Sequence, residues 1–256
     1  MGPVAGAAQE KDALATPAAQ SFSASIGFAT SGRLDETASP LRFSGRGADF
    51  ALRYERERAS LRFSAALEGG TRSLTPLDDN DGSTEQLTEA RLELSLLRAL
   101  RGSSEFARHT AAGIQFVASS MLTDHAYASA SVVRNDFVLA AASLGPTASW
   151  EHAIAGGHLT ANIGIPLVAL VDHPFSDVRD KPVPADFRFV SAASYRAMSG
   201  GISFSSALSS ALGIVYSYRI RVMHFDDAQP VSAVTQSVSV GLVRRFAKAR
   251  VAKGER

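Results

Sequence analysis

Residues 233–246 read AVTQSVSVGLVRRF, and this stretch decides the fold. Val234, Val238, Val240, Leu242 and Phe246 share one parity, while small hydroxyl residues and glycine occupy most of the other. Successive side chains of a β-strand point to opposite faces, so strict alternation over this length predicts a strand with one apolar and one polar face.

The same stretch resembles the C-terminal strand of Gram-negative outer-membrane β-barrels, which closes on an aromatic residue. Val238, Val240, Leu242 and Phe246 carry the resemblance. It implies a protein of the bacterial outer membrane that meets the barrel-assembly machinery during insertion. Outer-membrane lipid and lipopolysaccharide are then the expected partners. Members of this class more often end at the aromatic, whereas here a basic tail, 247–256, follows it as an expected periplasmic extension.

Composition narrows the classes of protein. The 256 residues suit one large domain or two small ones, and 26 basic and 25 acidic residues leave no basic footprint for nucleic acid. There is no cysteine, so the chain has neither disulfides nor cysteine-bound zinc. The longest apolar run, 163–171, is too short for a membrane helix and contains a proline.

The sequence divides into an N-terminal lead-in and a barrel segment. Residues 1–19 predict a flexible lead-in and residues 20–246 the barrel. Within the lead-in, residues 4–9 resemble the small-residue end of a signal-peptide cleavage site, although no charged and apolar leader precedes them. We therefore expect either a removed signal peptide or an ordinary flexible terminus.

Alternating runs recur along the chain and predict an antiparallel up-and-down transmembrane β-barrel. We expect about ten strands, within a range of about eight to twelve. A bulge or kink is expected at Gly145-Pro146 and another at Gly200-Gly201, where the apolar parity flips. The expected strands cover residues 20–31, 48–56, 59–69, 86–98, 108–120, 135–152, 158–171, 187–204, 212–222 and 233–246.

The connections are expected to alternate in length. Short turns on one side and long loops on the other are typical of outer-membrane barrels, whose short turns face the periplasm. An even strand number places both termini on that side. Expected short turns lie near 56–58, 99–104, 154–157 and 206–210, and long loops near 32–44, 71–84, 121–133, 172–185 and 226–231.

Alternation alone does not separate a membrane barrel from a soluble secreted β-sandwich or β-barrel. Mid-strand charges on the polar face favour a hydrated lumen. Aromatic residues near the ends of runs favour interfacial girdles, although a single tryptophan makes a thin girdle. The girdle candidates are Phe22, Phe28, Tyr54, Trp150, Phe187 and Phe189.

Charges of both signs are expected to face the lumen. A barrel of about ten strands encloses little free space, so an interior filled with salt bridges is favoured over a small selective pore. The predicted network comprises Arg53, Glu55, Arg62, Glu68, Glu89, Arg91, Glu93, Arg219 and Arg221, with Arg245 near the chain end.

Acid and histidine residues gather in the expected outer loops and suggest a rim hydrolase as an alternative. Omptin proteases are ten-stranded barrels with aspartates and a histidine at the outer rim, and Asp79 and Asp81 are spaced like their acid pair. Here, however, Asp and His are adjacent rather than one residue apart, and solvation alone accounts for acidic loops. The candidates are Asp79, Asp81, Asp124, His125, Asp172, His173 and His224.

Two further motifs fail. No histidine has serine two residues later, as lipid-modifying outer-membrane hydrolases require, although Thr160 follows His158. The acidic run at 78–82 does not fit a calcium loop, because Leu77 would occupy its first position and Thr88 its twelfth. We therefore favour a non-enzymatic barrel with a structural, adhesive or narrow-pore role and expect no metal or cofactor.

Overall fold

The computed structural model describes residues 19–35, 39–77, 83–100, 104–126, 135–172, 187–226 and 230–246. These residues form a closed antiparallel barrel of ten strands in up-and-down order, which confirms the predicted fold class. The elements are β1 (Ala19–Asp35), β2 (Ser39–Arg58), β3 (Leu61–Pro76), β4 (Thr84–Ala99), α1 (Glu105–Arg108), β5 (Thr110–Ala126), β6 (Asn135–Ile154), β7 (Gly157–Gly164), β8 (Val168–Asp172), β9 (Arg188–Ser191), β10 (Tyr195–Ala207), β11 (Leu212–Phe225) and β12 (Val231–Phe246).

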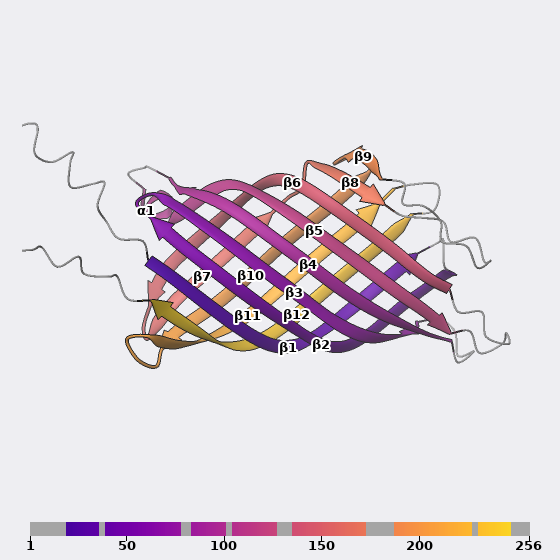
Figure 1. The fold of residues 1–256 in the computed structure, drawn as a ribbon, viewed down its shortest axis with the longest axis horizontal. Helices are drawn as coiled ribbons and strands as arrows, with labels where there is room; N and C mark the ends of the chain where they lie inside the picture. Colours follow the sequence, from indigo (N-terminus) through magenta and orange to yellow (C-terminus); the bar gives the residue numbers. More distant parts are fainter. Residues whose placement is uncertain are drawn as a thin grey trace, which may run out of the picture.

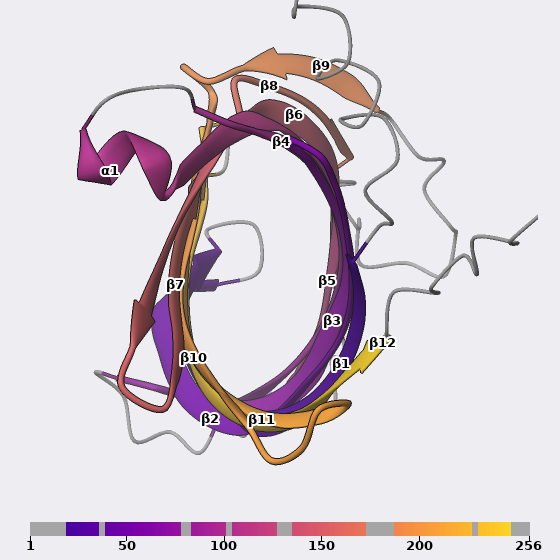
Figure 2. The same ribbon diagram turned by 90° about the vertical axis from the view of Figure 1, so that its left-hand side faces the viewer.

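Ten strands arise from twelve segments because two strands are interrupted. β7 and β8 both pair with β6, and β9 and β10 pair with β8 and β7 in turn. Pairing of β1 with β12 and of β5 with β6 closes the wall, which is visible end-on in Figure 2. A closed barrel leaves no unpaired edge strand along its wall, as a membrane requires.

The register sets the tilt of the strands. Followed from partner to partner around the wall, it leaves β6 at Thr147 and returns at Asn135, a displacement of 12 residues (147 − 135). A shear of this size over ten strands corresponds to a tilt of about 40° and a narrow interior. Figure 1 shows the resulting diagonal strands.

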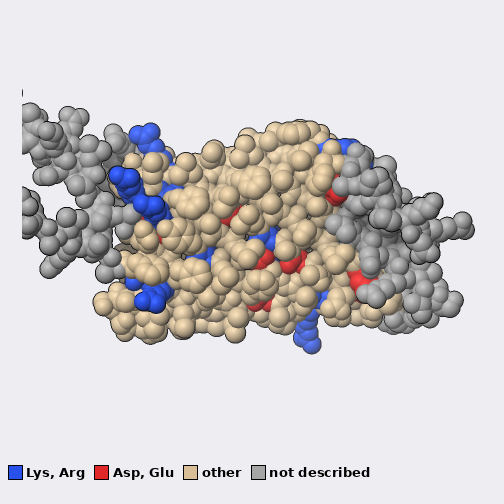
Figure 3. Space-filling view, in the orientation of Figure 1, with Lys and Arg blue, Asp and Glu red and all other residues tan. Residues whose placement is uncertain are grey.

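An apolar belt surrounds the half of the barrel nearest the termini. Ile26 on β1, Ile114 on β5 and Val238 on β12 are each more than half exposed and face outward. Side chains this apolar are stable on the outside of a barrel when lipid covers them. Figure 3 shows a largely uncharged face, with Lys and Arg gathered at the left end.

Beyond the belt, the inner face of the wall is apolar and the outer face polar, which is the reverse of the arrangement in the belt. On β3, Leu67 faces outward and Glu68 inward, whereas further along Thr71 and Ser73 face outward and Leu74 is fully buried inside. The same exchange occurs on β4, where Leu92 is exposed in the belt but Leu87 is buried in the lumen. Apolar side chains inside and polar ones outside are the arrangement of a barrel in water. The strands therefore extend past the membrane on the side away from the termini.

This extension corrects the expected loops. β1 runs to Asp35 and β2 begins at Ser39, so most of the expected loop at 32–44 is strand. Likewise β3 reaches Pro76 and β5 reaches Ala126, inside the expected loops at 71–84 and 121–133. The loop prediction was wrong there because the alternation continues with its apolar and polar positions interchanged.

The expected kink at Gly145-Pro146 lies instead on the neighbouring strand. β6 is continuous, and Pro146 pairs in register with Ile114. Leu144 lies opposite Val168 and Thr147 opposite Gly164, so residues 165–167 face only 145–146. This extra residue is a β-bulge. It turns Ala169 and Val171 into the lumen, whereas unbroken alternation from the exposed Ile163 would place them on the outward face.

No bulge occurs at Gly200-Gly201. β10 keeps an unbroken register with β11 from Tyr195 to Ala207, and its odd-numbered residues face the lumen throughout. The apolar parity changes because the lumen changes: Tyr195 lies in an apolar part of it and Ser199 in a polar part. The irregularity on this strand lies at residues 192–194, between β9 and β10.

The chain ends of the barrel lie together. Gln20 on β1 pairs with Phe246 on β12, so both strands meet the same rim, at the left of Figure 1. The tight turns at 59–60 and 155–156 and the short helix α1, which the sequence did not predict, lie at this rim too. Except for Ala19, the expected lead-in 1–19 and basic tail 247–256 lie outside the described residues. Within the described ranges, no helix has the length and apolarity to cross a membrane.

The tight turn between β6 and β7 requires glycine. Gly156 has a φ of 82°, a left-handed conformation that is open to glycine without strain. We expect Gly156→Ala to lower the free energy of unfolding by about 1 kcal/mol. Urea titration of the protein in lipid vesicles measures this change, and Ala155→Gly in the same turn is the control. Equal stability of Gly156→Ala and the native chain would contradict the assignment.

Candidate functional site

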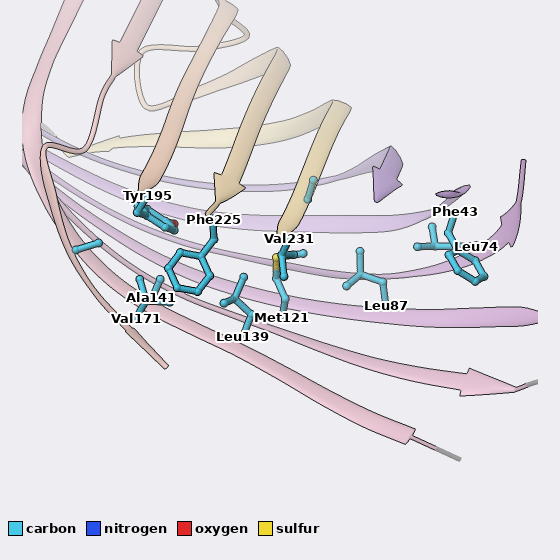
Figure 4. Close-up of a cluster of buried hydrophobic side chains, with 12 residues drawn as sticks. Phe43, Leu74, Leu87, Met121, Leu139, Ala141, Val171, Tyr195, Phe225 and Val231 are labelled. Atoms are coloured by element: carbon cyan, nitrogen blue, oxygen red, sulfur yellow. The ribbon is translucent and has the colours of Figure 1, made fainter. Parts of the chain in front are cut away.

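A layer of apolar side chains crosses the lumen in the part of the barrel beyond the membrane belt. Its members come from β2, β3, β4, β5, β6, β8, β10, β11 and β12, so nearly the whole wall contributes. Figure 4 shows several of these side chains pointing inward from the surrounding strands. We call this group the apolar layer: Phe43, Leu74, Leu87, Met121, Leu139, Ala141, Ala169, Val171, Tyr195, Phe225, Val231 and Ala233.

The next layer toward the termini is ionic. Arg219 on β11 pairs with Glu68 on β3, and Arg221 reaches Glu89 on β4 with its NH1 nitrogen 3.0 Å from Oε1. Three strands of the wall separate β11 from β3, so these pairs span the lumen. We call the group the ionic layer: Asp49, Arg53, Glu68, Arg72, Glu89, Arg91, Glu93, Arg219 and Arg221.

Arg72 ties the ionic layer together. Its guanidinium is fully buried and lies 2.7 Å from the Glu89 carboxylate and 3.3 Å from that of Asp49. Arg91 adds a further pair, 2.9 Å from Glu93. Buried charges persist only when they are paired and hydrogen-bonded. The layer therefore fills the lumen with mutually neutralising side chains.

A polar pocket of about 150 Å³ lies between the ionic layer and the rim that carries the termini. Serine side chains of β1, including Ser21, Ser23 and Ser25, line one wall. Arg62 on β3 crosses toward β6 and binds Glu151 through two hydrogen bonds, the NH2–Oε2 bond being 2.8 Å. Arg53 pairs with Glu55 at 3.7 Å. Arg245 also lines this pocket.

A small buried cluster lies inside the opposite end, away from the termini. Glu85 accepts a 2.5 Å hydrogen bond from Arg33, and its other oxygen lies 3.6 Å from His125 Nε2. All three side chains are almost completely buried. The edge of the His125 ring meets Phe43, with the ring centroids 5.4 Å apart. The histidine thus packs beside the apolar layer.

The acid–histidine candidates among the described residues lie on strands rather than in outer loops. Asp124 and His125 are consecutive residues of β5, so His125 points into the lumen and Asp124 to the other face. His224 faces outward from β11 and hydrogen-bonds Ser232 at 2.7 Å. Asp172 is buried on β8. Expecting these four residues in loops was wrong, because the strands continue through them.

Other candidates fall outside what can be placed. Asp79, Asp81 and His173 lie outside the described residues. Among the described residues, no three His, Asp or Glu side chains come together in a way that could hold a metal ion. The acid–histidine contact that the structure does contain, Glu85 with His125, lies inside the barrel rather than on its rim.

The predicted lumen network lacked several charged residues that the structure places inside the barrel. It did not include Asp49 or Glu151, and Arg72 and Arg33 fell in the expected loops at 71–84 and 32–44. The signal that identifies Arg72 is the alternation of Thr71, Arg72, Ser73 and Leu74, which continues the lumen-facing parity of Glu68. No sequence signal pairs Arg219 with Glu68, because 151 residues separate them.

The residues of the C-terminal signal lie on the lipid-facing side of β12. Val238 pairs with Phe28, Val240 with Ile26 and Leu242 with Ala24 on β1. All three, and Phe246, are exposed on the barrel exterior. The stretch that indicates the fold in the sequence is therefore the strand that closes the wall against β1.

Comparison with known proteins supports the fold alone. No protein-family model and no curated protein matches the chain. The structure is similar to the outer membrane protease OmpT of Escherichia coli, with a TM-score of 0.54 at 9% identity over 90% of this chain and 97% of that one.

Two other solved structures align less closely. The translocator domain of autotransporter NalP from Neisseria meningitidis gives a TM-score of 0.49 at 10% identity, covering 92% of each chain. The Ail protein of Yersinia pestis gives 0.39 at 13% identity, covering 88% of this chain and 98% of that one. The fold is that of a Gram-negative outer-membrane β-barrel, and the alternative of a soluble β-sandwich was wrong.

Proposed function

We propose that this chain is a sealed outer-membrane barrel with a structural or adhesive role at the cell surface. The observation that carries the proposal is the apolar layer, in which Leu74, Leu87, Val171 and Val231 have at most about 1% of their surface exposed. An apolar constriction expels water and so stops ions. Of the structural, adhesive and narrow-pore roles, passage of solutes through the lumen is therefore the one with the least support.

The ionic layer supports the same conclusion. A conducting pore keeps its lumen charges hydrated, whereas Arg72 and Glu68 are buried and engage partners from other strands. Opening a path here would separate several ion pairs at once. Beyond the belt, the polar outer wall extends the barrel into the surrounding water. This favours a role for the extension on the exterior of the cell.

Two measurements test this proposal. We expect purified protein in planar lipid bilayers to give no conductance steps, under conditions in which a general porin conducts. We expect cells displaying the protein to bind surfaces coated with matrix or host-cell components more than cells with an empty vector, or its deletion to weaken the envelope against detergent. Discrete conductance steps from the native protein would favour the narrow pore instead. Absence of both cellular effects would remove the structural and adhesive roles.

A rim hydrolase is the second candidate, because the structure is similar to that of the outer membrane protease OmpT. The acid–histidine contact of the described residues, His125 with Glu85, lies inside the barrel. The histidine is 2% exposed, so substrate cannot reach it without rearrangement. We expect His125→Ala and His173→Ala to leave any hydrolysis of peptides or lipids unchanged. Loss of a measurable native activity in either variant would favour the enzyme.

A further inference from the structure

The outer wall carries a long apolar groove in the membrane belt. It has a volume of about 1280 Å³ and crosses β10, β11, β12, β1, β2, β3 and β4. Small outward residues, Ala48 and Ala90, lie between larger ones such as Phe28, Phe50 and Tyr218. A surface of this kind in the belt is covered by hydrocarbon, and its hollow shape suits acyl chains lying along the wall.

A polar hollow of about 570 Å³ continues the groove toward the extracellular side. The two share three strands at consecutive outward positions. Phe28 is followed by Thr30 on β1, Ala48 by Arg46 on β2, and Thr71 by Ser73 on β3. The residues lining the polar hollow are Thr30, Ser31, Gly32, Ser44, Gly45, Arg46, Ser73 and Thr75.

Two arginines lie at this hollow, Arg46 in its lining and Arg42 beyond it on the same strand. Arg42 and Arg46 are exposed on the same outward face of β2, on either side of Ser44. Neither has an ion-pair partner among the described residues, whereas exposed Arg196 on the opposite wall lies 4.0 Å from Asp226. The two arginines are four positions apart on the strand, which separates their Cα atoms by about 13 Å. Their spacing suits a ligand with two separated anionic groups.

We propose that this wall binds a phosphorylated glycolipid of the outer leaflet. Its acyl chains lie in the apolar groove, its saccharide lies against the hydroxyls of Thr30, Ser44 and Ser73, and its two phosphates meet Arg42 and Arg46. Arginine binds phosphate through paired N–H donors. A glycerophospholipid has acyl chains too, but it presents one phosphate and no disaccharide to span the two arginines.

The charge arm of the test uses native mass spectrometry of the full barrel in detergent. We expect bound lipid A, and about tenfold weaker binding after Arg42→Gln with Arg46→Gln, since two charge-assisted contacts are lost. Arg56→Gln with Arg58→Gln, which removes two charges at the other end of the same strand, is the matched control and should bind like the native chain. Heat-modifiable gel migration confirms that each variant remains a folded barrel.

The ligand arm separates this site from ordinary lipid contact. Lipid A without its phosphates, and phosphatidylglycerol, should each bind about tenfold more weakly than lipid A. Ala48→Phe fills the groove at a lipid-facing position and should reduce lipid A binding with both arginines in place. The proposal is overturned if phosphatidylglycerol binds as well as lipid A. It is also overturned if the double arginine variant or Ala48→Phe binds like the native protein.

Discussion

Glu68→Gln will lower the free energy of unfolding by about 3–5 kcal/mol, among the largest effects of any single substitution in this barrel. Glu68 is buried and pairs with Arg219 and, at 3.9 Å, with Arg221. Glutamine has nearly the same shape but no charge. Both guanidiniums then remain in the lumen with less compensation, and breaking a buried ion pair costs far more than breaking one at the surface.

Urea titration of the protein in phospholipid vesicles measures this loss. Glu57→Gln is the matched control, since Glu57 is half exposed and only 4.0 Å from Arg62 at the periplasmic rim. We expect it to change the stability by less than about 0.5 kcal/mol. Similar losses in the two variants would mean that the ionic layer is hydrated and open, contrary to the sealed lumen.

Phe225→Ala will cost about 3–5 kcal/mol, because it leaves a cavity in the apolar layer. The Phe225 side chain is 3% exposed and contributes one of the largest rings in that layer. The lost stability combines the transfer of the ring to water and the incomplete collapse of its surroundings. The same titration in vesicles measures it.

Phe189→Ala is the control for this substitution. Its ring lies on β9 and is 80% exposed, so truncation leaves no enclosed cavity. We expect a loss of about 1 kcal/mol or less. If the Phe225 variant were equally mild, the extracellular half of the lumen would not be a packed core, and the argument against conductance would lose its main support.

The barrel could be predicted from the sequence because the alternation of apolar and polar residues recurs from strand to strand. Alternation in 233–246 and in the belt segments is independent of which strand pairs with which. Closure, strand number and the position of the termini follow from that pattern and from the loop lengths. Arg53, Glu68 and Arg219 were likewise assigned to the lumen from parity alone, since their position in the alternation determines their face.

The prediction from the sequence was wrong where the rule for membrane-spanning strands was applied to segments that lie beyond the membrane. Leu74 stands at a lumen position, so a rule of apolar outside and polar inside removed its segment from the strands. The Asp124-His125 pair failed for a related reason: adjacency makes a pair in a loop but separates the side chains in a strand. The contact of Arg33 with Glu85 depends on the closed wall, and no local pattern encodes it.

The exchange of apolar and polar faces along each strand makes the height of the barrel independent of its fit to the bilayer. The belt sets the anchoring depth, while the part of the barrel beyond it has its own packed interior, the apolar layer. Adding two residues to each strand of a hairpin beyond the belt would raise the tip of that hairpin by about 5 Å and leave the belt unchanged. Changes of strand length beyond the belt would therefore be enough to set the distance of the rim from the membrane surface.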